Sequence, residues 1–171
     1  ISGAGTQSNT VLGNWIGFWP DDQAADAGLT PAPEPYFAGI YLEGQTSKNR
    51  IGGEAPNVIA GNSYGIYLNA ASENVIAGNL VGLAPDGITM RANHETGIMI
   101  KLASHNNIIG GTTPTERNVV SGNASVGIMI RDTGSDENQV IGNYIGLSSN
   151  GLVGVANKKH GIVIQSDGQA T

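Results

Sequence analysis

A short phrase bounded by asparagines recurs along this chain, and it constrains the fold more than any other feature. The phrase reads Asn-x-(Val/Ile)-x-Gly-Asn and occupies residues 9–14, 57–62, 74–79, 118–123 and 138–143, with a truncated copy at 107–111. A second phrase, Gly-Ile-x-(Leu/Ile), occupies residues 39–42, 65–68, 97–100, 127–130 and 161–164. This paired recurrence predicts one supersecondary unit stacked about five times.

The repeated units alternate between two lengths. Short units span residues 47–68 and 104–130, long units span 72–100 and 136–164, and a first long unit at 8–42 carries an insertion. Spacings of this size are typical of repeats made from a few short strands joined by turns. Each unit is therefore expected to form one turn of a coil.

The fixed and variable places within each phrase follow a period of two, which predicts strands and not helices. In the first phrase the third place is always Val or Ile, whereas the fourth place varies. In the second phrase the second and fourth places are always aliphatic, and the third changes freely. We expect the fixed places to face the interior and the variable places, including Leu12, Ala60, Ala77, Ser121 and Ile141, to face solvent.

Strands this short need partners, so each is expected to pair in parallel with its equivalent one unit away, at about 4.8 Å. The product is an all-β parallel solenoid of about five rungs in which like residues stack in columns. An amide ladder is predicted for Asn49, Asn74, Asn107 and Asn138. An aliphatic column is predicted for Ile40, Ile66, Ile98, Ile128 and Ile162. Glycine, 26 of 171 residues, suits the corners between strands.

The segments at 107–111, 117–123, 127–130 and 138–146 resemble the right-handed parallel β-helix repeats of the pectate-lyase-like superfamily. The closest resemblance is to repeat arrays of secreted and cell-surface bacterial proteins. It covers the chain outside residues 19–35 and implies a right-handed coil and a secreted or cell-surface location. The superfamily includes lyases, hydrolases, epimerases, phage spikes, adhesins and structural stalks, so the resemblance indicates fold and not function.

Residues 1–171 are expected to form a single β-helix domain without a capping helix. The first and last residues of the chain lie at the same position within the repeated unit. This predicts either a piece of a longer array or end-to-end stacking of copies.

The composition excludes several kinds of site and partner. The chain has no cysteine, so disulfides and thiolate sites are excluded. A formal net charge of −6 disfavours nucleic acid as a partner. The absence of a run of about 20 apolar residues predicts no membrane-spanning helix.

The outer face of the Gly-Ile sheet is where the resemblance would place acidic calcium ligands and a catalytic base. The sequence puts Tyr41, Tyr67, Met99, Met129 and Val163 there, followed by Glu43, Asn69, Lys101, Arg131 and Gln165. No pair of aspartates lies among them, which favours a protein without catalysis or cofactor. Lys101 and Arg131 are instead candidate ligand-binding cations, with a solvated structural role as the alternative.

Residues 19–35 contain four prolines and are expected to form a stiff lateral loop. With Tyr36, Tyr41 and Tyr67, Trp19 of this loop would form an aromatic surface for sugar rings. Asp21 and Asp22 would accept hydrogen bonds or bind calcium. In the alternative interpretation, the nearby aromatic residues cover an end rung and the acids keep the loop soluble.

Two polar segments, His94–Glu95 and Lys158–His160, precede Gly97 and Gly161 and are expected at one edge, two rungs apart. They would act as acid and base or bind a metal, or they are simply solvated loops.

Three functions from different classes follow from these observations. The first, which the uniform repeats favour, is an extracellular structural or adhesive segment without catalytic activity. The second is a polysaccharide lyase or glycoside hydrolase, which requires converging carboxylates. The third is a carbohydrate-binding module for a polysaccharide or cell-surface glycan.

Overall fold

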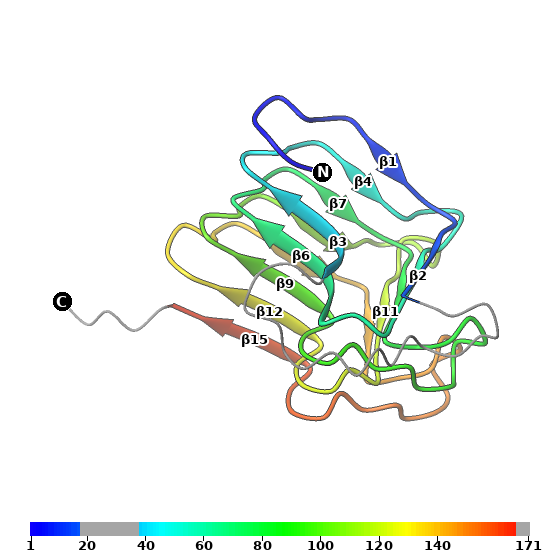
Figure 1. Ribbon diagram of the computed structural model, residues 1–171. Coiled ribbons are helices and arrows are strands. Elements are labelled where there is room, and N and C mark those ends of the chain that lie inside the picture. Colours follow the sequence, from blue (N-terminus) through cyan, green and yellow to red (C-terminus); the bar gives the residue numbers. More distant parts are fainter. Residues whose placement is uncertain (18–37, 167–171) are drawn as a thin grey trace.

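The computed structural model describes residues 1–17 and 38–166. In these residues fifteen short strands form three parallel sheets of five strands each, and every strand pairs with its equivalents one rung away. Figure 1 shows the rungs stacked from the N-terminal β1 to the C-terminal β15. The fold is a right-handed parallel β-helix of five rungs, which confirms the predicted architecture.

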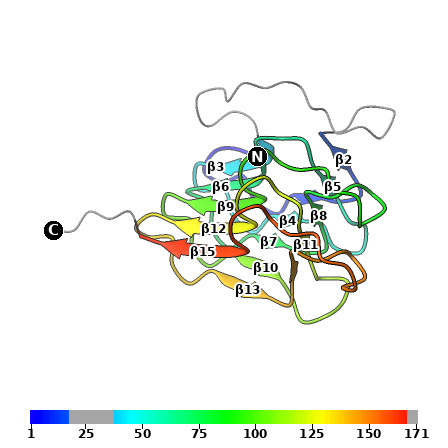
Figure 2. The same cartoon turned by 90° about the horizontal axis from the view of Figure 1, so that it is seen from below.

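Each rung contributes one strand to each sheet, in a fixed order. Sheet 1 contains β1 (Thr10–Val11), β4 (Arg50–Ile51), β7 (Val75–Ile76), β10 (Ile108–Gly110) and β13 (Gln139–Ile141). Sheet 2 contains β2 (Trp15–Ile16), β5 (Val58–Ile59), β8 (Leu80–Val81), β11 (Val119–Val120) and β14 (Tyr144–Ile145). Sheet 3 contains β3 (Ala38–Glu43), β6 (Tyr64–Asn69), β9 (Ile98–Lys101), β12 (Ile128–Arg131) and β15 (Ile162–Gln165). Figure 2 shows the strands of sheets 1 and 3 on two sides of the coil.

Aliphatic columns fill the interior of the coil. The predicted column pairs Ile40 with Ile66, Ile66 with Ile98, Ile98 with Ile128 and Ile128 with Ile162. The three middle members, Ile66, Ile98 and Ile128, are fully buried, whereas Ile162 is 45% exposed because no further rung of the described residues packs on it. The middle rungs therefore contribute most of the hydrophobic stabilisation.

The connections between sheets explain why the repeat alternates in length. Between sheets 1 and 2 they are long in rungs two and four, at residues 52–57 and 111–118, and short in the other rungs. Between sheets 2 and 3 they are long in rungs three and five, at residues 82–97 and 146–161. Successive rungs thus place their extra residues at different corners of the coil.

The asparagine phrase proves to occupy two different corners. Residues 9–14, 74–79 and 138–143 lead from sheet 1 to sheet 2, whereas 57–62 and 118–123 lead from sheet 2 toward sheet 3. The solvent exposure predicted for the fourth place was wrong for Ala60, Ala77 and Ser121, which are fully buried. Neighbouring connections cover these places: the N–H of Gly61 donates to Ala92, and that of Gly78 donates to Glu116.

At the corners between strands, residues other than glycine also adopt the left-handed backbone conformation. Ser8, Lys48, Glu73, Asn106 and Glu137, each directly before an asparagine of one column, have φ between 55° and 60°. Glycine is required where rungs approach closely. A Cβ atom at Gly97 would lie 2.7 Å from the carbonyl oxygen of Gly127 in the next rung.

The part of the chain that the structure describes contains no helix long and apolar enough to cross a lipid bilayer. The predicted lateral loop at 19–35 lies outside the described residues.

Candidate functional site

Three asparagine ladders run along the coil, whereas the sequence pattern predicted one. The ladder at the start of sheet 1 contains Asn9, Asn49, Asn74, Asn107 and Asn138. The ladder before sheet 2 contains Asn14, Asn57, Asn79, Asn118 and Asn143. The ladder after sheet 2 contains Asn62, Asn93, Asn123 and Asn157. The amide ladder predicted from the sequence is therefore present.

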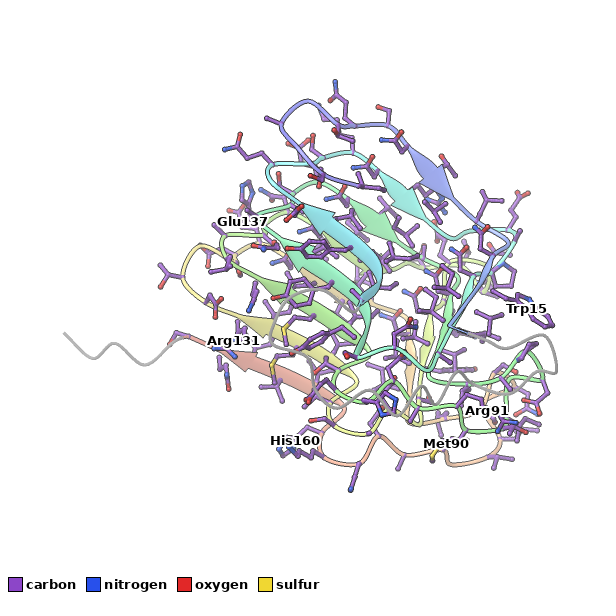
Figure 3. All side chains as sticks on the ribbon, in the orientation of Figure 1. Trp15, Met90, Arg91, Arg131, Glu137 and His160 are labelled. Carbon is purple, nitrogen blue, oxygen red and sulfur yellow. The ribbon has the colours of Figure 1, made fainter. Side chains whose placement is uncertain are left out.

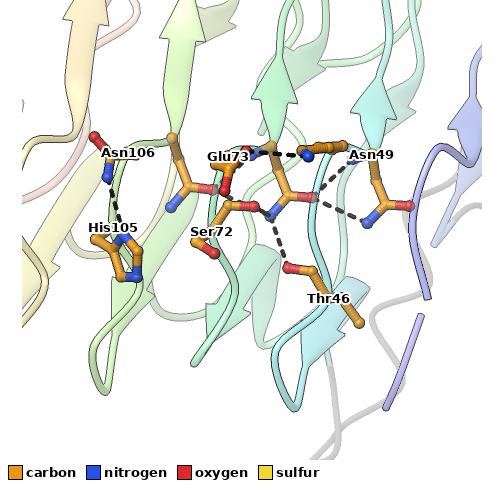
Figure 4. Close-up of polar contacts among 9 residues, drawn as sticks. Thr46, Asn49, Ser72, Glu73, His105 and Asn106 are labelled. Atoms are coloured by element: carbon orange, nitrogen blue, oxygen red, sulfur yellow. Dashed lines mark hydrogen bonds and ion pairs between the residues drawn. The ribbon is translucent and has the colours of Figure 1, made fainter. Parts of the chain in front are cut away.

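Every ladder has the same direction: the Nδ2 of each asparagine donates to the Oδ1 of the asparagine in the following rung. Asn49 shows the pattern, because its backbone N–H and its Nδ2 each donate to Oδ1 of Asn74 at 3.0 Å. Figure 4 shows this contact together with Thr46, whose carbonyl oxygen accepts from Nδ2 of Asn74 at 3.4 Å. The ladders satisfy the polar groups at the corners and fix the register of successive rungs.

The outer face of sheet 3 carries the predicted column of Tyr41, Tyr67, Met99, Met129 and Val163 in register. The Tyr41 and Tyr67 rings lie 5.3 Å apart, and Tyr64 meets Tyr67 edge to face at 5.1 Å. Nζ of Lys101 lies 5.3 Å from the centre of the Tyr67 ring. Burial raises the pKa of Tyr41, whose hydroxyl accepts a hydrogen bond from Asn69 at 2.8 Å.

These contacts limit how sheet 3 can meet a ligand. Tyr67 is fully buried and Met99 is 5% exposed, so neither presents an open ring face or side chain. Arg131 donates from Nε to Oδ1 of Asp132 at 2.8 Å. Figure 3 shows Arg131 on the sheet 3 side of the coil, away from Trp15 of sheet 2. Binding by Tyr41, Tyr67, Lys101 and Arg131 remains a prediction, and the candidates Trp19, Asp21, Asp22 and Tyr36 lie outside the described residues.

The two polar segments identified in the sequence lie in equivalent connections of rungs three and five. Counted from the ladder residues Asn93 and Asn157, His94 corresponds to Lys158 and Thr96 corresponds to His160. The two histidines therefore occupy different places of the repeat. Among residues 1–17 and 38–166, no three side chains of His, Cys, Asp or Glu gather to hold a metal ion. Calcium binding, predicted as a weak option, has no support in this part of the chain.

A hollow that sequence reasoning missed lies where sheet 1 leads into sheet 2. The long connections of rungs two and four approach each other over the short third connection, where a Cβ atom at Gly78 would lie 2.6 Å from the carbonyl oxygen of Gly53 and 2.4 Å from that of Thr115. The hollow that both connections line has a volume of about 380 Å³. We call it the corner groove, and its lining includes Glu54, Pro56, Leu80, Pro114, Arg117 and Val119.

Arg117 is the cation among the described residues that line the corner groove. Its guanidinium carbon lies 4.2 Å from the centre of the Tyr144 ring, and its Nε donates to the carbonyl oxygen of Gly142 at 3.0 Å. A second hollow, of about 460 Å³, shares Gly53 and Glu54 with the corner groove and is lined by Leu12 and Arg50. The sequence signal was the pair of longer segments at 52–57 and 111–118, but their proximity depends on the intervening short rung.

Comparison with known proteins gave one family. The model described as "Periplasmic copper-binding protein (NosD)" matches residues 34–167. No curated protein and no solved structure matches the chain.

The side chains in the structure do not fit a copper centre. Protein copper sites draw on thiolate, thioether and imidazole ligands, but the chain has no cysteine and three histidines. Met99 and Met129 pair in register on sheet 3. Their neighbours along each strand include the cations Lys101 and Arg131, which oppose a bound metal cation. Two thioethers without a third donor, beside two positive charges, do not form a copper site in residues 1–17 and 38–166.

Proposed function

The chain belongs to the NosD family of periplasmic copper-binding proteins, and we propose that it is a non-catalytic β-solenoid segment acting outside the cytoplasm as a structural or adhesive element. The observation that carries this proposal is the set of three asparagine ladders, which join the rungs in one direction throughout the described coil. Such ladders, together with parallel strand pairing, favour a stiff support for surface side chains.

Two indications support the proposed location. The description of the family includes the word periplasmic, and the sequence resembles repeat arrays of secreted and cell-surface proteins. Both support a place in the cell envelope or beyond it, where glycans are abundant partners. Copper is not part of the proposal, because the donor set described above does not suit it.

The enzyme alternative requires carboxylates that converge on a substrate. On the outer face of sheet 3, Glu43 pairs in register with Asn69, and Asn69 pairs with Lys101. Asp132 is engaged with Arg131. This arrangement favours contact with a ligand over acid–base catalysis, for which paired carboxylates are the usual machinery.

A binding and turnover assay on the same samples tests the proposal. The protein is incubated with isolated cell-envelope glycans and with soluble acidic and neutral polysaccharides, and bound protein and released reducing or unsaturated ends are both measured. We expect saturable binding to at least one glycan and no product. Release of product that depends on the protein overturns the non-catalytic role, and the absence of all binding overturns the adhesive role.

A further inference from the structure

The three methionines of the chain differ in how far solvent reaches them. Met90, in the connection between sheets 2 and 3 of rung three, is 52% exposed, whereas Met99 on sheet 3 is 5% exposed and Met129 is partly buried. The chain has no cysteine, so every sulfur atom in it belongs to a methionine thioether. Oxidation of sulfur by a peroxide therefore falls on methionine, and exposure favours Met90.

Backbone hydrogen bonds hold the hairpin that carries Met90. The N–H of Ala84 donates to the carbonyl oxygen of Thr89 at 2.8 Å. The N–H of Arg91 donates to the carbonyl oxygen of Gly82 at 2.9 Å. Neither bond involves the Met90 side chain, so the hairpin is expected to keep its backbone when that side chain is modified.

The Met90 side chain lies on the surface of rung four. A Cβ atom added at Gly122 would lie 2.9 Å from Cγ of Met90, so this part of the side chain covers the glycine. Figure 3 shows Met90 at the lower edge of the molecule, beside Arg91. Because 52% of the residue is exposed, an oxygen atom added to its sulfur can face solvent, and no aliphatic column of the interior has to move.

The outer face of sheet 3 protects the other two methionines. Met99 pairs in register with Tyr67 on one side and with Met129 on the other. An oxidant reaches the Met99 sulfur only after local opening of the groups that cover it. Met129 pairs with Val163 in the fifth rung and is intermediate in exposure. The expected order of reaction is therefore Met90, then Met129, then Met99.

We propose that Met90 is a reversible oxidation site, at which a peroxide converts the thioether to the sulfoxide while the coil stays folded. A lone pair of the sulfur attacks one peroxide oxygen, the S–O bond forms as the O–O bond breaks, and water leaves. The sulfur loses two electrons and the peroxide gains them. Methionine sulfoxide reductases reverse this change in proteins. Oxidation at Met90 goes beyond the proposed structural or adhesive function and does not depend on it.

Peptide mapping by mass spectrometry after treatment with hydrogen peroxide tests the site. In the native protein we expect Met90 to gain one oxygen atom at least about tenfold faster than Met99, with Met129 between them. In urea, which unfolds sheet 3, the three methionines should react at similar rates. Reaction of Met99 or Met129 as fast as Met90 in the native protein overturns the proposal. The same difference in urea also overturns it, because the difference would then not come from the fold.

A matched pair of variants assigns the fast reaction to one sulfur. Met90→Leu conserves the volume of the side chain and removes the thioether, so the fast phase of oxygen uptake should disappear. Met129→Leu is the control and should retain that phase. Fast uptake that persists in Met90→Leu, or disappears in Met129→Leu, overturns the assignment.

Two further measurements test tolerance and reversal. The melting temperature of the oxidised protein should lie within about 4 °C of that of the untreated protein, and a larger fall would show that the coil does not tolerate the sulfoxide. Treatment with reductases for both sulfoxide epimers should return the protein to its original mass. A sulfoxide that resists both enzymes in the folded protein overturns the reversibility of the site.

Discussion

Asn74 donates two hydrogen bonds to the same oxygen of Asn107, from its backbone N–H at 2.9 Å and from Nδ2 at 3.1 Å. Both residues are fully buried. Asn107 in turn donates from Nδ2 to Ala71 and to Asn138, both at 2.9 Å. One side chain therefore satisfies polar groups in three successive rungs, which makes the corner sensitive to its loss.

Asn107→Ala is expected to lower the free energy of unfolding by about 2–4 kcal/mol, because it leaves the buried N–H of Asn74 without its acceptor and removes one acceptor of Nδ2 of Asn74. Chemical denaturation measures the loss. Asn106→Gly is the matched control, since Asn106 is exposed and its φ of 55° suits glycine. A similar loss in both variants would mean that the ladder bonds contribute little.

Two members of one aliphatic column test how burial controls stability. Ile98 is fully buried in the third rung, whereas Ile162 is 45% exposed in the fifth. Ile98→Ala should cost about 2–5 kcal/mol and Ile162→Ala less than half as much, because the second leaves a smaller cavity. Urea midpoints of the two variants provide the comparison. Equal shifts would indicate that the last rung is packed as tightly as the middle of the coil.

The sequence was sufficient to predict the columns, because an aliphatic place that never varies must face the interior of every rung. The ladder from Asn49 to Asn138 could be predicted for the same reason. The ladder of Asn62, Asn93, Asn123 and Asn157 could not be found from the phrase alone. Its signal is the Ala-Asn pair shared by 92–93 and 156–157, which lies outside the repeated strands.

The surface was harder to predict because it depends on which connections lie side by side. Alternation along a strand places Ser121 outward, yet its Oγ donates to the carbonyl oxygen of Leu147 at 2.7 Å and is buried. The contact between Arg117 and Tyr144 joins two rungs and has no local sequence signal. The positions that recur in every rung therefore predict which side chains fill the interior of a solenoid. They do not predict the grooves that form between its longer connections.

Close approach of rungs makes a further prediction at Gly97. A Cβ atom there would lie 2.7 Å from the Gly127 carbonyl oxygen and 2.8 Å from Nδ2 of Asn123. Gly97→Ala should destabilise the coil by about 1–3 kcal/mol or more, because backbone atoms must move. Gly154→Ala is the control, since nothing lies within 4 Å of its added Cβ. Thermal melts should separate the two variants, and an unchanged melting temperature in Gly97→Ala would contradict the close packing of rungs.

The connection at residues 84–91 should respond to acid through Asp86. Hydrogen bonds from the Thr89 hydroxyl and from the N–H groups of Ile88 and Thr89 hold the pKa of Asp86 below its ordinary value of 3.8. A carboxylate with a lowered folded pKa stabilises the folded state above its ordinary pKa, and this contribution is lost as the pH falls through the folded value.

Amide exchange of Ile88 and Thr89, corrected for the intrinsic pH dependence, is therefore expected to show protection near neutral pH that declines below about pH 4. Asp86→Asn is the control, because an amide oxygen accepts hydrogen bonds at every pH and its exchange should lack this transition. Protection in the native protein that stays constant down to pH 2, or a decline of the same size in Asp86→Asn, would show that the Asp86 carboxylate does not hold this connection.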